Sequence, residues 1–321
     1  MCRPHRATRH LQGGSIRKSN PTASEFLNHS PLEGESNGGA VWWGQRPSLL
    51  AFAAMDFVSA TDVAEAIAAK ADNPDAEFLA GGTDLMVEVN LAAHRPASVI
   101  GLRRVDEIQE ITRSRIGAGV TWARLEQAPH RALAQAARAV GSPQIRAAGT
   151  VGGNVGTASP AGDALAWIAA LDGGIEVASR DRGRRVVPWD EFFIGVKQTS
   201  LAADEMITAV VLPDDVAPVQ EFAKVGARNA MVISTVSCVV ANTTTGYRVA
   251  LGSVAPTPMR AFRAEEMINT EASPSPAAIA EFGRIVATEV RPITDHRSTE
   301  TYRRHCAGVL ARRLLERCLV A

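Results

Sequence analysis

Hydrophobic patterning divides the chain at Met55. Over residues 1–54, apolar side chains keep neither the 3.6-residue period of a helix nor the two-residue period of a strand. This segment is either a disordered arm or a spurious extension, with translation beginning at Met55. We favour the extension, because ordered patterning begins immediately after Met55.

Short strands and helices alternate after that point. Thr61 is placed to cap a helix that the Asn73-Pro74 pair ends. Residues 77–80 predict a strand that runs into a glycine turn at residues 81–84, and residues 99–102 predict a further strand. The pattern therefore predicts a small β-α-β-turn-α-β unit.

The central part of the chain mixes helical and strand signals. Alanine-rich periodicity predicts helices over residues 132–140 and 164–171. A hairpin is expected across residues 175–187, and residues 206–212 read as a strand. Two prolines lie at the ends of residues 213–218, where we expect a domain boundary.

The last third of the chain has a different pattern. Residues 221–225, 232–241 and 247–251 read as strands with no long helix between them, which favours an antiparallel sheet. Helical periodicity follows over residues 277–290 and 302–319. These two helices are expected to cover one face of that sheet.

Composition narrows the possible functions. Basic and acidic residues balance at 34 each, which argues against partners that need a strong basic field, such as nucleic acid or a membrane surface. No apolar run is long enough to span a bilayer. The four cysteines are scattered without a C-x-x-C pair, so we expect no zinc site, iron–sulfur cluster or disulfide framework, and a cytoplasmic location.

Two glycine-rich segments are the main candidates for chemistry. Residues 149–163 contain five glycines and one charged side chain, and residues 81–84 read Gly-Gly-Thr-Asp. Bare backbone beside a hydroxyl group, ahead of a helix, is typical of sites whose N–H groups bind an anion. We therefore expect a pyrophosphate cradle.

Other nucleotide and catalytic motifs are incomplete. The G-x-G at residues 117–119 lacks the third glycine of a Rossmann fingerprint, because position 122 is Trp. Neither glycine segment has the G-K-[S/T] of a P-loop, and Ser159 precedes Pro160 rather than standing in a G-x-S-x-G elbow. Without a base–nucleophile set, redox chemistry would depend on a bound cofactor.

In its motifs and their order the sequence resembles the FAD-binding (medium) subunit of the molybdenum hydroxylases, the xanthine dehydrogenase and carbon monoxide dehydrogenase type. The agreement extends over nearly all of residues 55–321. The matching segments are Leu79–Leu85, Gln144–Asp163, Glu191–Phe193 with Lys197 and Thr199, Phe222–Arg228, Leu251–Pro258, Asp295–Arg297 and Tyr302–Arg304.

The resemblance implies an α+β fold. A two-subdomain FAD-binding domain of the PCMH type would occupy residues 55–213, with subdomains of about 55–104 and 105–213. A C-terminal flavoprotein domain with a small antiparallel sheet and helices would occupy residues 214–321. Ala147 stands where the family usually has Asn, a departure close to the flavin.

The resemblance also implies which residues hold FAD. Two segments would line the diphosphate, Asp163 would bond the adenosine part, and Lys224 would lie near the flavin. Val140 and Ile207 match apolar positions that contact the flavin or the adenine. The full set of implied cofactor contacts is Leu79, Ala80, Gly81, Gly82, Thr83, Asp84, Val140, Thr150, Val151, Gly152, Gly153, Asn154, Asp163, Ile207 and Lys224.

The implied role is electron transfer within a complex. A large molybdopterin chain would oxidise the substrate, and a small chain with two [2Fe–2S] centres would pass electrons to FAD, which would reduce NAD or another acceptor. Two alternatives remain open: a stand-alone FAD-dependent oxidase or dehydrogenase, and a non-catalytic nucleotide-binding or assembly protein.

Overall fold

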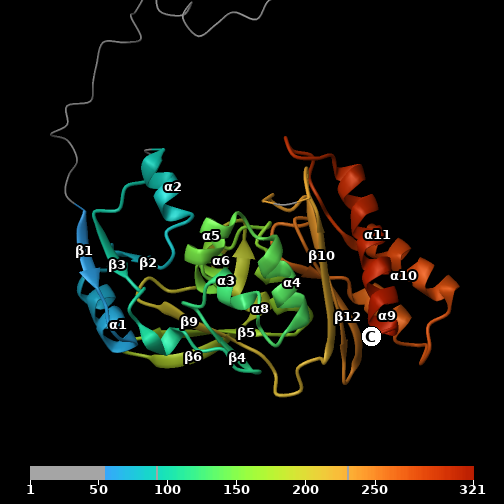
Figure 1. Ribbon diagram of the computed structural model, residues 1–321, viewed down its shortest axis with the longest axis horizontal. Helices are drawn as coiled ribbons and strands as arrows, with labels where there is room; N and C mark the ends of the chain where they lie inside the picture. The colour runs from blue at the N-terminus through green and yellow to red at the C-terminus, as the bar shows by residue number, and fades with distance from the viewer. Residues whose placement is uncertain (1–54, 92, 230) are drawn as a thin grey trace, which may run out of the picture. The chain divides into compact units, whose positions relative to one another are not determined.

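The computed structural model describes residues 55–321 except 92 and 230. The expectation for residues 1–54 lies outside these described residues. The described part contains one parallel sheet and antiparallel sheets that follow it along the chain (Figure 1).

The first unit is a three-stranded parallel sheet with two helices. It consists of β1 (Asp56–Ser59), α1 (Val63–Asp72), β2 (Glu77–Leu79), α2 (Leu85–Asn90) and β3 (Ser98–Gly101). The strand order is β1-β3-β2, and both pairings are parallel. The predicted β-α-β-turn-α-β unit is confirmed, and the glycine turn at residues 81–84 follows the carboxyl end of β2.

The predicted cap of the first helix is wrong by one residue. Asp62 is the N-cap, and its carboxylate accepts a hydrogen bond from the N–H of Glu65 at 2.7 Å. Thr61 instead donates its own N–H and hydroxyl to the Glu65 carboxylate. Two adjacent residues of capping type compete for one helix start, and the carboxylate occupies the position nearer the free N–H groups.

The central part builds a four-stranded antiparallel sheet in the order β4-β9-β5-β6. Helix α7 is buried along its whole length, and it packs against the sheet that follows and against its neighbouring helices. The elements are η1 (Asp106–Ile108), β4 (Arg115–Gly117), α3 (Trp122–Leu125), α4 (Arg131–Ala139), α5 (Pro143–Ala148), α6 (Val151–Thr157), α7 (Asp163–Ala170), β5 (Gly174–Ser179), β6 (Gly183–Pro188), α8 (Trp189–Phe192), β7 (Phe193–Gly195), β8 (Gln198–Thr199) and β9 (Met206–Val211).

Helices α5 and α6 were not predicted. Helix α6 occupies the glycine-rich run, and α5 occupies the segment just before it. Each is started by a hydroxyl side chain: Ser142 accepts from the N–H of Ile145, and Thr150 from the N–H of Gly153. A good cap and tertiary packing outweigh the low helix propensity of glycine here.

The C-terminal part is an antiparallel sheet in the order β10-β11-β12-β13, as expected. Helices α9, α10 and α11 lie on one side of it, and the central helices lie on the other (Figure 1). Its elements are β10 (Val219–Val225), β11 (Val236–Thr243), β12 (Gly246–Gly252), β13 (Met259–Arg260), α9 (Phe262–Ile268), α10 (Pro276–Glu289) and α11 (Glu300–Leu319).

Strand β11 separates two apolar cores. Cys238 and Val240 point into the core beneath α10 and α11, whereas Val239 and Ala241 point into the core around α7. This alternation is that of a strand buried on both faces. The sheet therefore joins the C-terminal helices to the central part of the molecule.

Strand β10 is the outer strand of this sheet, and a side chain occupies its open edge. Gln135 of α4 accepts the N–H of Phe222 at 2.7 Å. Its amide nitrogen donates to the carboxylate of Glu221 at 2.8 Å. The glutamine thus hydrogen-bonds where a neighbouring strand would.

Candidate functional site

The structure brings the two glycine segments into contact. A Cβ atom on Gly81 would lie 2.0 Å from the carbonyl oxygen of Ala148 and 2.8 Å from the Cα of Gly149. The hydroxyl of Thr157 donates to the carboxylate of Asp84 at 3.1 Å. The turn after β2 therefore packs directly against α5 and α6, and only glycine fits at residue 81.

The turn at residues 81–84 leaves its backbone donors free. Within the described part of the chain, the N–H groups of Gly81, Gly82, Thr83 and Asp84 donate no hydrogen bond. Gly82 has a φ of +68°, which belongs to the left-handed region. Consecutive N–H groups around such a residue form a concave anion site, so this turn can bind a diphosphate.

The first N–H groups of helix α6 already donate to acceptors within the protein. Val151 donates to Val120 O at 3.0 Å, Gly152 to Ala118 O at 2.8 Å and Gly153 to Thr150 Oγ1 at 3.0 Å. The expectation that free N–H groups in this segment point at an anion is therefore wrong for these three residues. The free N–H donors are those of the turn after β2, whereas α6 contributes a backbone surface that a ligand can approach.

The two adjacent glycines of α6 have different reasons to be glycine. A Cβ on Gly152 would lie 2.5 Å from the Cβ of Ala118, so this position is closed by protein packing. A Cβ on Gly153 would meet only Thr150 Oγ1, at 3.3 Å. Gly153 thus presents the open side of the helix, where a ligand could approach the backbone.

Asp163 and Lys224 form a buried ion pair at the start of α7. The Lys224 Nζ lies 2.6 Å from Asp163 Oδ2, and the two side chains are 8% and 5% exposed. Ser234 donates its hydroxyl to Asp163 Oδ1 at 2.5 Å, and Lys224 also donates to Val232 O at 3.1 Å. Burial raises the pKa of the Asp163 carboxyl, and the charge of Lys224 opposes that shift.

A cavity of about 400 Å³ lies beside this pair. Its volume is in the range of small-molecule sites. The lining residues come from α4, β10 and the loop after β10: Gln135, Ala139, Phe222, Ala223, Lys224, Val225, Gly226, Arg228, Asn229 and Val232. The ion pair and the cavity thus form one polar site next to the end of α4.

The remaining predicted residues are placed near these elements. Val140 follows α4 directly, and Ile207 on β9 faces α6, where a Cβ on Gly156 would lie 3.4 Å from its Cδ1. Asn154 accepts the N–H of Ala164 at 3.3 Å and so holds the first turn of α7. Ser234 was missed, because a lone serine in a strand-like run gives no signal of its partner.

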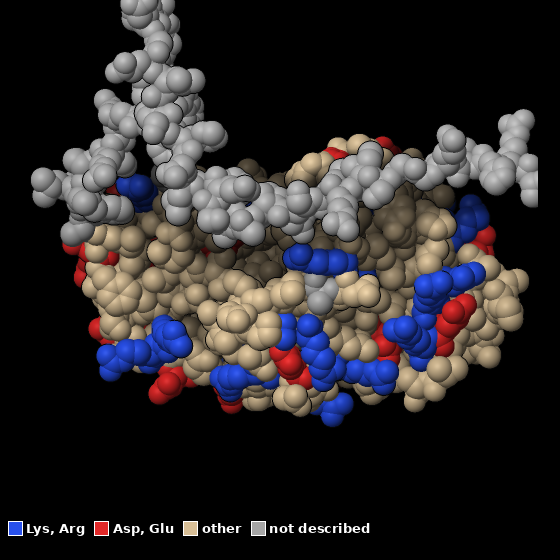
Figure 2. All heavy atoms as spheres, turned by 45° about the horizontal axis from the view of Figure 1, so that its top comes forward, with Lys and Arg blue, Asp and Glu red and all other residues tan. Residues whose placement is uncertain are grey.

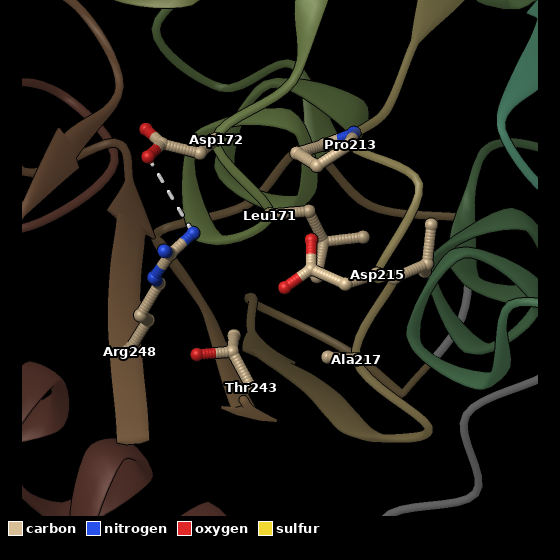
Figure 3. A pocket seen from close by; sticks show the side chains of 8 residues that line it. Leu171, Asp172, Pro213, Asp215, Ala217, Thr243 and Arg248 are labelled. Atoms are coloured by element: carbon tan, nitrogen blue, oxygen red, sulfur yellow. Dashed lines mark ion pairs between the residues drawn. The ribbon is translucent and has the colours of Figure 1, made fainter. Parts of the chain in front are cut away.

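A second cavity, of about 120 Å³, lies elsewhere. It is formed where the end of α7, the segment before β10, and strands β11 and β12 meet (Figure 3). Asp172 and Arg248 form an ion pair across it, at 3.5 Å. None of the predicted cofactor contacts lines this cavity, so it is not a candidate for that role.

Other classes of site receive no support from the described residues. None of their His, Cys, Asp and Glu side chains gather in threes that could hold a metal ion. On the face presented in Figure 2, basic and acidic side chains lie next to one another rather than in a patch of one sign. No described helix has the length and apolarity to cross a membrane.

Comparisons with known proteins agree with this geometry. Residues 52–215 match the model of the FAD-binding domain in molybdopterin dehydrogenase, and residues 221–318 match the CO dehydrogenase flavoprotein C-terminal domain. The medium subunit of nicotine 6-hydroxylase from Paenarthrobacter nicotinovorans is 32% identical, over 82% of this chain and 96% of that protein. The xanthine dehydrogenase FAD-binding subunit of Escherichia coli O157:H7 is 29% identical, over 83% and 97%.

A solved structure has the same architecture. A chain of carbon monoxide dehydrogenase from Hydrogenophaga pseudoflava aligns with a TM-score of 0.74 and 28% identity, over 83% of this chain and 97% of that one. The α+β fold implied by the resemblance is confirmed. The chain therefore belongs to the FAD-binding subunits of the molybdenum hydroxylases, the group that includes the xanthine and carbon monoxide dehydrogenases, and its cofactor is FAD.

Proposed function

We propose that this chain is the flavin-carrying electron-transfer subunit of a multi-chain oxidoreductase. The bound FAD supplies two-electron redox chemistry, taking electrons from [2Fe–2S] centres on a small chain and delivering them to NAD or another acceptor. A large molybdopterin chain carries the substrate site. The relatives named above are themselves described as subunits, which supports partners of this kind.

The diphosphate is assigned to the surface where the two glycine segments meet. The free N–H groups of residues 81–84, which follow Leu79 and Ala80, donate to its oxygens. Residues 150–154 would line it from the α6 side, and Gly153, on the open side of the helix, would allow close approach of the backbone. The free donors of the turn after β2 are the observation that carries the proposal, because a set of consecutive, solvent-accessible N–H groups can bind an anion.

The rest of the cofactor is assigned to the region around the ion pair. Asp163 would bond the adenosine part, and Lys224 lies beside the cavity. The half-buried Val140 and the largely buried Ile207 would supply apolar contacts. The buried ammonium group of Lys224 would place a positive charge near an electron-rich ring or a phosphate of the cofactor. The contact of Lys224 with Asp163 fixes the position of both groups before any ligand binds.

Residues 55–213 would form the FAD-binding domain, and residues 214–321 the C-terminal domain. The two family matches, which meet between residues 215 and 221, support this division. Three buried free cysteines, Cys238, Cys306 and Cys318, suit a reducing compartment, so we place the protein in the cytoplasm.

The test begins with the purified wild-type chain. It should be yellow, release its flavin without a covalent link on denaturation, and bleach with dithionite. A colourless protein that cannot be loaded with FAD would refute the proposal. Recovery of a cysteine-rich small chain and a large molybdenum-containing chain with it would exclude the stand-alone oxidase. Reduction of the bound FAD through that recovered complex, without dithionite, would exclude the non-catalytic protein.

A site variant tests the cradle itself. Gly153→Leu places a side chain on the open side of α6 and should lower FAD content about tenfold or more. Gly153→Ala is the matched control, because its single methyl group meets only Thr150 Oγ1 at 3.3 Å and should leave folding intact. Full flavin content in the leucine variant would place the diphosphate elsewhere.

A further inference from the structure

Arg303 of α11 is a buried cation that no step of the proposed function uses. Its side chain is 4% exposed, and its Nη2 donates to Asp295 Oδ1 at 2.8 Å. Its Nη1 donates to two backbone carbonyls, those of Thr235 at 2.7 Å and Ser253 at 2.9 Å. A buried guanidinium with three acceptors on separate segments fixes the distances between those segments.

The segments that Arg303 holds lead to the ion pair. Thr235 follows Ser234, whose hydroxyl donates to Asp163. Ser253 donates its own hydroxyl to Ser234 O at 2.9 Å and its N–H to Pro160 O at 2.7 Å, three residues before Asp163. Arg303 thus sits behind the short stretch that positions both the carboxylate and, through Val232 O, the ammonium of Lys224.

We propose that Arg303 is a positioning residue for the cofactor site. It holds residues 232–235 so that Ser234 Oγ and Val232 O keep Asp163 and Lys224 in their binding geometry. This inference rests on the proposed function, because the ion pair is assigned there to the FAD site. Arg303 itself contacts neither Asp163 nor Lys224. It acts through the backbone of residues 232–235.

The first test measures the ion pair directly, without FAD. Acetylation of the full-length chain by an N-hydroxysuccinimide acetate compares Lys224, 8% exposed, with Lys197, 53% exposed, as the internal reference. Arg303→Met should raise the ratio of Lys224 to Lys197 modification by about fivefold or more, because residues 232–235 open more often. Arg303→Lys, which keeps the charge but not the planar fork, should lie between the two.

Arg304 on the same helix is the matched control. It donates to Val290 O and pairs with Glu300, and it makes no contact with residues 232–235. Arg304→Met should keep the lysine ratio within about twofold of the wild type. The inference is overturned if Arg303→Met also stays within that range, or if both variants raise the ratio equally. Should Arg303→Met fail to fold, Arg303→Lys decides: a ratio within about twofold of the wild type overturns the inference, and a higher one supports it.

The second test measures FAD binding by flavin fluorescence. Arg303→Met should raise the dissociation constant for FAD about tenfold or more, whereas Arg304→Met should change it by no more than about twofold. A wild-type chain that binds no FAD contradicts the proposed function and leaves the lysine ratio intact as a readout. Wild-type binding with equal affinity in Arg303→Met contradicts only the positioning role.

Discussion

The buried pair of Asp163 and Lys224 gives the sharpest prediction about the energetics of this site. The two charges lie 2.6 Å apart, with side chains 5% and 8% exposed. At an effective dielectric constant of about 20, such a pair attracts with about 6 kcal/mol. The cost of removing both charges from water opposes most of this, so the pair as a whole contributes little net stability.

Breaking the pair has a different cost from deleting it. Lys224→Met leaves the Asp163 carboxylate buried with only the Ser234 hydroxyl as a side-chain donor. The loss of one partner from a buried pair costs about 3–5 kcal/mol, so we expect that decrease in the free energy of unfolding at pH 7. The double variant Asp163→Asn/Lys224→Met should lose less than the sum of the single variants, because it leaves no charge behind.

The pH dependence has a definite sign. Burial already raises the pKa of Asp163, and removal of the lysine raises it further. An acid whose pKa is higher in the folded than in the unfolded state destabilises the fold once pH exceeds its unfolded pKa. The deficit of Lys224→Met should therefore be largest at pH 7 and smaller at pH 5, where more of the carboxyl is protonated.

Urea unfolding of the FAD-free proteins, followed by tryptophan fluorescence, measures these free energies. A loss below about 1 kcal/mol in Lys224→Met at pH 7 would refute the reasoning, because a surface pair behaves in that way. Strict additivity in the double variant would refute it as well. Either result would mean that water reaches the carboxylate in solution.

Two further predictions concern folding. Burial raises the pKa of Asp295, but hydrogen bonds from Arg303 and from the N–H groups of Arg297 and Ser298 outweigh it and lower this pKa to about 2. Asp295→Asn should therefore lower the free energy of unfolding by about 1–2 kcal/mol at neutral pH. The gap to the wild type should close as pH falls from about 4 towards 2, where the wild-type carboxyl protonates; a gap that is constant in urea unfolding across this range contradicts the assignment. Gly152→Ala should lower stability by about 2 kcal/mol through its clash with Ala118, whereas Gly153→Ala should be neutral or stabilise by about 0.5–1 kcal/mol, and equal melting temperatures would contradict the distinction.

The order of elements could be predicted because patterning is local. The parallel β-α-β unit, the hairpin of β5 and β6, and the antiparallel C-terminal sheet all follow from period and turn chemistry. Helix α6 could not be predicted in this way. Its stability depends on the Thr150 cap and on Ala118, a residue from a separate segment against which Gly152 packs.

The cofactor site was predictable only in outline. Glycine composition indicates backbone exposed to a ligand, yet it does not distinguish Gly152, which packs on protein, from Gly153, which does not. It also does not show that the free N–H groups lie in the turn after β2 rather than in α6. Ser234 and Arg303 reach the site through tertiary contacts, which leave no trace in local patterning.

The glutamine on the outer strand of the C-terminal sheet has a consequence for solubility. An unpaired strand edge is a template on which another chain can add a strand, and this is a common route to aggregation. Gln135 occupies both the N–H of Phe222 and the carboxylate of Glu221, so part of the β10 edge is already hydrogen-bonded. Helix α4 and its Gln135 side chain therefore cover this part of the edge, where Gln220, Glu221 and Phe222 are buried, so it offers little template for another strand.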